Sequence, residues 1–149
     1  MERALVVIEP SQKGRELTRI AGEFAEGLGG ELIIIHALDE SKYQEEIQRK
    51  GHSGAEIKSE SDLIEEASNT AEEIATDALK NYDVSYTAEG MVGSLPNDLL
   101  DLATEQNCDH VFITGEQRSP TGKAVFGDIS QKILLNFDGP VTTLIAYDE

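Results

Sequence analysis

Short apolar runs alternate along this chain with longer stretches in which apolar residues recur every three or four positions. Short runs rich in β-branched residues are typical of strands that are buried on both faces of a parallel sheet. Apolar residues at the helical period are typical of helices that cover such a sheet. The sequence therefore predicts strands over 4–8, 32–35, 84–91, 111–113 and 141–145, and helices over 17–28, 62–79, 96–103 and 128–137.

The alternation of strands and helices predicts the fold class. Five strands separated by four main helices indicate one doubly wound, three-layer α/β domain, with a five-stranded parallel sheet between the helices. No shift in composition divides residues 1–149 into two domains. The polar segment 39–61 does not fit the pattern. We expect it to be an exposed excursion with at most a short helical stretch around 43–49.

The charge of the chain limits its partners. Aspartate and glutamate number 29 against 12 lysines and arginines, which gives a net charge of −17. Such a field repels nucleic acids and anionic membranes, so we expect neither as a partner. A halophile-like, salt-rich cytosol would explain the acidity, because dense carboxylates keep a surface hydrated while counter-ions screen their repulsion.

Several observations favour a cytoplasmic protein. No run of eighteen apolar residues could span a membrane, and the first residues enter a strand pattern without a secretory leader. Cys108 is the only cysteine, so it cannot form an internal disulfide. A reducing compartment is the simplest setting for such a chain.

The loop from Gly115 to Gly127 is the clearest candidate for a ligand site. It reads GEQRSPTGKAVFG, with Arg118 and Lys123 inside it, and it joins a predicted strand to a predicted helix. A glycine-rich loop before a helix can direct backbone N–H groups and cationic side chains towards a phosphate. A flexible loop that binds nothing would also favour glycine, but it would not need the two basic residues.

Four of the twelve basic side chains are predicted to meet at one edge of the sheet. Open parallel sheets bind ligands beyond the carboxyl ends of the strands where the strand order reverses, between the loops that follow the first and fourth strands. Those loops and their immediate continuations carry Lys13, Arg15, Arg118 and Lys123. This grouping predicts an anionic small molecule as the ligand. The alternative is that the cations are solvated and balance nearby acids such as Glu16 and Glu116.

The standard phosphate, metal and nucleophile motifs are not found in the sequence. Six residues separate Gly115 from Gly122 instead of the four of a P-loop, and no G-x-G-x-x-G follows an early strand. The three histidines and the cysteine lack metal-ligand spacing, although His36 falls where it could line a crevice. No serine has an evident histidine and acid partner. We expect no catalytic residue and no metal site.

The residues and their order resemble the universal stress protein (UspA-like) family. The resemblance covers nearly the whole chain. It is carried by the opening strand and helix, the late pattern G-x-x-x-x-x-x-G-K-A-x-F-G-D-x-x-Q and the Gly-Pro-Val before the last strand. It implies a sheet of order 3-2-1-4-5, a homodimer paired through the final strand, 141–145, and, in one branch of the family, ATP binding.

The late loop departs from the pattern of the ATP-binding branch, which reads G-x-x-G, nine residues, then G followed by Ser or Thr. Gly115 and Gly127 match the outer glycines with a spacing one residue short. Arg118 replaces the second glycine, and Gly122 supplies flexibility nearby. Asp128 stands in the place of the phosphate-binding hydroxyl.

The resemblance also implies roles at the ends of the first two strands. The family's Val-Pro-x-Asp-x-Ser becomes Val-Val-Ile-Glu-Pro-Ser over residues 6–11. Glu9 would then replace the ribose-binding aspartate, and the backbone of Ala37 would contact adenine, while Ser11 fits the N-cap of the first helix. The expected cofactor-binding set is Glu9, Pro10, Ser11, Ala37, Gly115, Arg118, Gly122, Lys123, Gly127, Asp128 and Ser130.

Asp128 bears most directly on what such a site can bind. Together with Gln131 it predicts a capping box for the last helix, worth about 1 kcal/mol. Its carboxylate would also repel a phosphate by about 1–4 kcal/mol at contact distance. Arg118 and Lys123, or a bound cation, could offset that charge, and Ser130 supplies another hydroxyl further along.

These observations lead to hypotheses of different classes. The first is a non-catalytic cytoplasmic homodimer that binds ATP or another adenine nucleotide, with or without magnesium, or another anion, and orders the segment 39–61 on binding. The second is a slow, metal-assisted nucleotide hydrolase that uses Glu9 or Asp128. The third is a protein-interaction module that has lost nucleotide binding.

Overall fold

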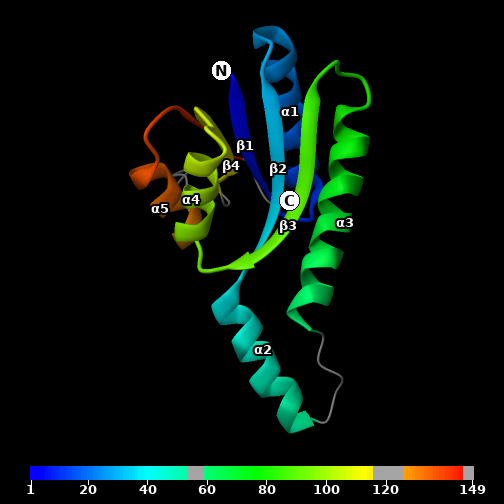
Figure 1. Ribbon diagram of the computed structural model, residues 1–149, viewed down its shortest axis with the longest axis vertical. Coiled ribbons are helices and arrows are strands. Elements are labelled where there is room, and N and C mark those ends of the chain that lie inside the picture. The colour runs from blue at the N-terminus through cyan, green and yellow to red at the C-terminus, as the bar shows by residue number, and fades with distance from the viewer. Residues whose placement is uncertain (54–58, 116–125, 146–149) are drawn as a thin grey trace.

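A five-stranded, fully parallel sheet forms the centre of the molecule (Figure 1). The structure is a computed structural model, which describes residues 1–53, 59–115 and 126–145. The strand order is β3-β2-β1-β4-β5, which confirms the predicted order and fold class. The strands are β1 (Arg3–Ile8), β2 (Glu31–Asp39), β3 (Ser85–Gly93), β4 (His110–Thr114) and β5 (Val141–Leu144).

The described residues form five helices, so the expectation of four main helices was incomplete. The additional helix, α2, occupies the polar segment in which only a short helical stretch was expected. Its large apolar residues are limited to Tyr43 and Ile47, because it covers neither face of the sheet. Figure 1 shows α2 projecting past the end of β2. The helices are α1 (Gln12–Leu28), α2 (Glu40–Ser53), α3 (Glu60–Leu79), α4 (Asn97–Glu105) and α5 (Asp128–Asn136).

Two separate cores cover the two faces of the sheet. Alternate residues of one strand point to opposite faces, so Val6 packs beneath α1 and α3 while Leu5 packs beneath α4 and α5. Ile34 and Ile33 divide in the same way on β2. Burial on both faces explains why these strands appear in the sequence as continuous apolar runs.

The second strand is longer than its apolar run predicted. The run ends at Ile35, but β2 continues to Asp39 and stays paired with β3 over that length. Residues 36–39 are only half-buried, because β1 has already ended at Ile8 beside them. The extension carries Ala37 and Asp39 to the carboxyl edge of the sheet.

The first helix begins and ends as its sequence predicts. The side chain of Ser11 accepts a hydrogen bond from the Gly14 N–H at 3.3 Å, which confirms Ser11 as the N-cap. Gly29 closes the helix in the left-handed region, at a φ of 72°. The first turn of α1 therefore lies directly against the loop that follows β1.

Cys108 lies just before β4 and His110 is its first residue, and both side chains have structural roles. Cys108 is half-buried against the core beneath α4 and α5, and burial raises the pKa of its thiol to about 11. The His110 ring stacks on Phe112, and its Nε2 lies 2.7 Å from the Thr142 hydroxyl of β5. Burial lowers the pKa of His110, so its ring stays neutral at pH 7. Among the described residues, no helix is both long and apolar enough to cross a membrane.

Candidate nucleotide site

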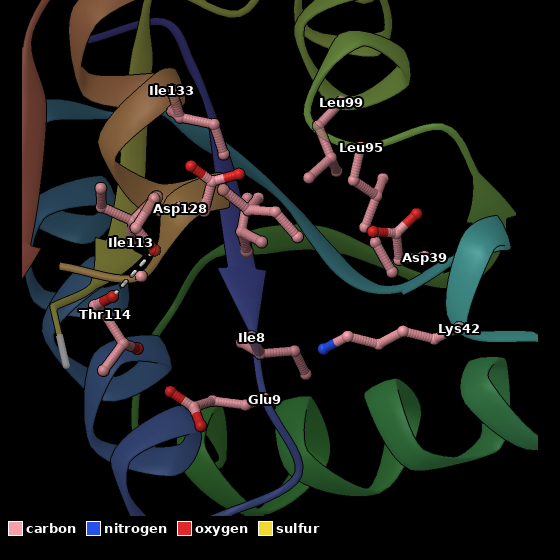
Figure 2. Close-up of a pocket in the computed structure, with 15 residues that line it drawn as sticks. Ile8, Glu9, Asp39, Lys42, Leu95, Leu99, Ile113, Thr114, Asp128 and Ile133 are labelled. Carbon is pink, nitrogen blue, oxygen red and sulfur yellow. Dashed lines mark hydrogen bonds between the residues drawn. The ribbon is translucent and has the colours of Figure 1, made fainter. Parts of the chain in front are cut away.

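A cavity of about 400 Å³ opens at the carboxyl edge of the sheet (Figure 2). It lies where β1 leads to one face of the sheet and β4 leads to the other, which is the point at which ligands bind in sheets of this topology. Its walls come from β1, β2, β4 and the beginnings of α2, α4 and α5. The lining residues are Val7, Ile8, Glu9, Ala37, Asp39, Lys42, Leu95, Leu99, Ile113, Thr114, Gly127, Asp128, Ile129, Ser130 and Ile133.

One wall of the cavity is apolar. Leu99 of α4, Ile113 of β4 and Ile133 of α5 belong to the core on that face of the sheet and end at the cavity. Leu95 and Ile129 pack against the same core and are partly buried. An apolar surface of this kind suits an aromatic ring, which gains by leaving water without needing a hydrogen bond at its faces.

The charged residues that line the cavity are mostly negative. Glu9 follows β1, Asp39 ends β2, and Asp128 begins α5. Lys42 is the one cation among the described lining residues. Figure 2 shows its side chain reaching from α2 towards Ile8 and Glu9, across the mouth of the cavity.

The predicted capping box at the start of α5 is wrong. Gly127 is the N-cap, with an extended backbone at φ −63° and ψ 159°, and its carbonyl accepts the Gln131 N–H at 2.9 Å. Asp128 is therefore the first helical residue, and its carboxylate pairs with Lys132 one turn later at 3.1 Å. Because glycine has no side chain to cap the helix, the first N–H groups of α5 keep their capacity to bind an anion.

Ser130 and Thr114 link the start of α5 to the end of β4. The Ser130 hydroxyl donates to the Thr114 carbonyl at 3.2 Å, drawn as a dashed line in Figure 2. The Thr114 side chain is only 7% exposed, and within the described parts of the chain its hydroxyl has no hydrogen-bond partner. A buried, unpaired hydroxyl in the wall of a cavity is a polar group that a ligand can satisfy.

The family model for universal stress proteins matches residues 1–144 of the chain. Together with the five-stranded sheet and the cavity at its switch point, this match decides the classification. The chain belongs to the universal stress protein family. The resemblance noted from the sequence is thereby confirmed.

Solved structures show the same fold across nearly the whole chain. The hypothetical protein MJ0577 is 16% identical at a TM-score of 0.73, with 99% of this chain and 98% of that one covered. The universal stress protein from Archaeoglobus fulgidus in complex with dAMP is 18% identical, with a TM-score of 0.64 and coverage of 96% and 97%. A universal stress protein in complex with cAMP is 18% identical, with a TM-score of 0.61 and coverage of 98% and 96%.

No curated protein matches the chain. The two complexes show that other proteins with this fold bind an adenine nucleotide with a single phosphate. Identities below one fifth establish the shared fold and no more.

Five of the eleven residues expected at the site line the cavity. They come from three separate parts of the chain, which the fold brings to one edge of the sheet: Glu9, Ala37, Gly127, Asp128 and Ser130. Three other expected residues, Arg118, Gly122 and Lys123, lie outside the described residues.

The remaining expected residues lie next to the cavity but do not line it. Pro10 is exposed in the loop after β1, and Ser11 is used as the cap of α1. Gly115 packs against β5, since a Cβ there would come within 3.2 Å of Thr143. Nothing in the geometry gives these three positions a direct contact with a ligand in the cavity.

The predicted gathering of cations is not supported by its two described members, and the other two, Arg118 and Lys123, lie outside the described residues. Arg15 points away from the cavity and pairs with Asp77 of α3 at 2.9 Å, so for this residue the solvated alternative is correct. Lys13 is not among the lining residues. The cation that does line the cavity, Lys42, was missed because the sequence gave no reason to expect a helix beginning directly at the end of β2.

Other lining residues were missed because the sequence did not show that they reach the cavity. Asp39 lay outside the predicted strand 32–35, and Thr114 lay just after the predicted strand 111–113. The spacing of Leu95 and Leu99, four residues apart before and within α4, was the one available signal, but it also fits simple core packing.

His36 does not line the cavity, although its place at the end of a strand made it a candidate. The alternation along β2 turns it to the face covered by α1 and α3. Burial lowers the pKa of its ring, and its Nδ1 has no partner within the described residues. The parts of the chain that the structure describes contain no group of three acidic, histidine or cysteine side chains placed to hold a metal ion.

Proposed function

We propose that this universal stress protein is a non-catalytic, cytoplasmic homodimer that binds an adenine nucleotide in the cavity at the carboxyl edge of its sheet. The observation that carries the proposal is the meeting of five expected site residues around one cavity of about 400 Å³. That volume falls within the range of small-ligand sites. The relatives in complex with dAMP and cAMP support an adenine nucleotide as the occupant.

Each part of the cavity fits one part of a nucleotide. The backbone of Ala37 and the apolar wall would hold the adenine ring, and the Glu9 carboxylate would accept hydrogen bonds from ribose hydroxyls. The N–H groups that begin α5 and the Ser130 hydroxyl would face the phosphate. Lys42 would join α2 to the bound ligand, so that binding shifts the position of a helix with few other contacts.

We expect calorimetry to detect binding of adenosine or at least one of its phosphates, with no such binding for the matching guanosine compounds. Chromatography of the same mixtures, with and without magnesium, is expected to show no turnover. Turnover that is lost in Asp128→Ser would instead favour the slow hydrolase. Absence of binding by any adenine compound would leave a protein-interaction module and refute the proposed function.

The homodimer is proposed to form through β5. Within the described residues β5 pairs only with β4, and its four residues are all half-buried, so its outer edge is open to a second chain. Light scattering in molar KCl is expected to give twice the chain mass of 16.2 kDa. High salt is the appropriate condition, because two chains of −17 repel each other in dilute buffer. A mass of one chain would contradict the dimer.

A further inference from the structure

We propose that the cavity selects adenosine derivatives that carry at most one phosphate group and discriminates against ADP and ATP. This inference rests on the proposed function and specifies its ligand. It follows from the net charge of the groups around the cavity, from the position and ion pair of Asp128, and from the polar groups that remain available to a ligand.

The charges of the lining residues do not suit a phosphate chain. Among the described lining residues, Glu9, Asp39 and Asp128 contribute three negative charges and Lys42 one positive charge, and Lys132 pairs with Asp128 from outside the lining, so the balance is −1. Each phosphate added beyond the first brings further negative charge to this cavity. The Asp128 side chain is 82% exposed, so salt in the solvent screens its part of the repulsion.

Asp128 is the first residue of α5, the end of the helix at which a phosphate chain would gain most, and its side chain is 82% exposed. Its carboxylate begins α5 and benefits from the positive end of that helix. Its pairing with Lys132 at 3.1 Å engages the nearest cation of the same helix. A chain of phosphates would have to compete with this carboxylate for both partners.

Within the part of the cavity that the structure describes, the remaining polar side chains match one phosphate or none. Lys42 supplies a single counter-charge, and Figure 2 shows it directed across the cavity. The Ser130 hydroxyl already donates to the Thr114 carbonyl, so it would have to give up that bond to donate to a ligand. The Thr114 hydroxyl is buried and unpaired among the described residues, and as a neutral donor and acceptor it suits a ribose hydroxyl or one phosphate oxygen.

The test is a calorimetric series of adenosine, AMP, ADP and ATP at constant ionic strength, with EDTA present so that magnesium does not mask the phosphates. We expect AMP to bind at least about tenfold more tightly than ATP, with ADP between them. Raising the KCl concentration is expected to reduce the ratio of AMP affinity to ATP affinity, because the discrimination is electrostatic.

Two variants assign the discrimination to named residues. Asp128→Asn is expected to reduce the preference for AMP over ATP several-fold. Lys42→Met is expected to weaken the binding of AMP more than the binding of adenosine. Asp101→Asn is the matched control, because it removes the same charge from an exposed position on α4 outside the cavity. This control should leave the ratio unchanged.

The outcomes separate this inference from the function on which it rests. If ATP binds as tightly as AMP or more tightly, the cavity is a nucleotide site but the selection is refuted. If Asp101→Asn changes the ratio as much as Asp128→Asn does, the net charge of the chain is responsible and the assignment to the cavity is wrong. If no adenine compound binds, both the inference and the proposed function fail.

Discussion

Replacing Gly14 with alanine is expected to lower the free energy of unfolding by about 1–3 kcal/mol, the range for forcing extra atoms into a packed site. A Cβ at this position would overlap the carbonyl oxygen of Glu9. That oxygen is a backbone atom and cannot rotate away as a side chain could. Either α1 or the loop after β1 must shift, and the Ser11 cap on the Gly14 N–H would be strained with it.

The same helix offers a matched control at Gly27. No atom lies within 4 Å of a Cβ built there, so Gly27→Ala is expected to raise stability by about 0.5–1 kcal/mol through its effect on the unfolded chain. Urea unfolding of both variants gives the comparison directly. If the two substitutions changed stability equally, the close packing of α1 on the loop after β1 would be refuted.

Replacing Ala37 with phenylalanine is expected to weaken AMP binding by at least about a hundredfold, which corresponds to about 2.8 kcal/mol. Ala37 lines the cavity and is the expected contact for the adenine ring. A benzyl group at this position would fill the space that the base needs. The fold should tolerate the change, because Ala37 is only half-buried and an open cavity lies in front of it.

Titration calorimetry measures the loss, and thermal melting checks that the variant is folded. Thr87→Phe is the matched control, because it adds a phenyl ring to an exposed position of β3 outside the cavity. AMP binding that survives Ala37→Phe, in a variant that melts like the parent, would place the nucleotide elsewhere on the molecule.

The fold was largely predictable because each buried strand has an apolar run that is visible in isolation. Residues 4–8, 32–35 and 111–113 need burial on both faces, and only a parallel sheet covered by helices supplies it. The helix α2 was not predictable in the same way. It lies past the end of the sheet with few contacts to it, so no apolar stripe was required of its sequence.

The site was predictable only in part, for two physical reasons. Glu9 and Gly127 lie in loops that any sheet of this order brings together, and Asp128 begins the helix directly after one of them, so pattern and topology were enough to find them. The roles of Arg15 and Lys42 depended on side-chain partners. Arg15 reaches an acid on α3, and Lys42 enters the cavity because β2 runs four residues further than its apolar run.

The sequence by itself determined the layered α/β domain, the family and the edge of the sheet at which a ligand should bind. These follow from the order of apolar runs and turns, which act through local propensity and burial. Only the tertiary structure decided which charges face the cavity. Whether a carboxylate repels a ligand or pairs with a lysine depends on distances of a few ångströms between segments far apart in the chain, and no local pattern encodes those distances.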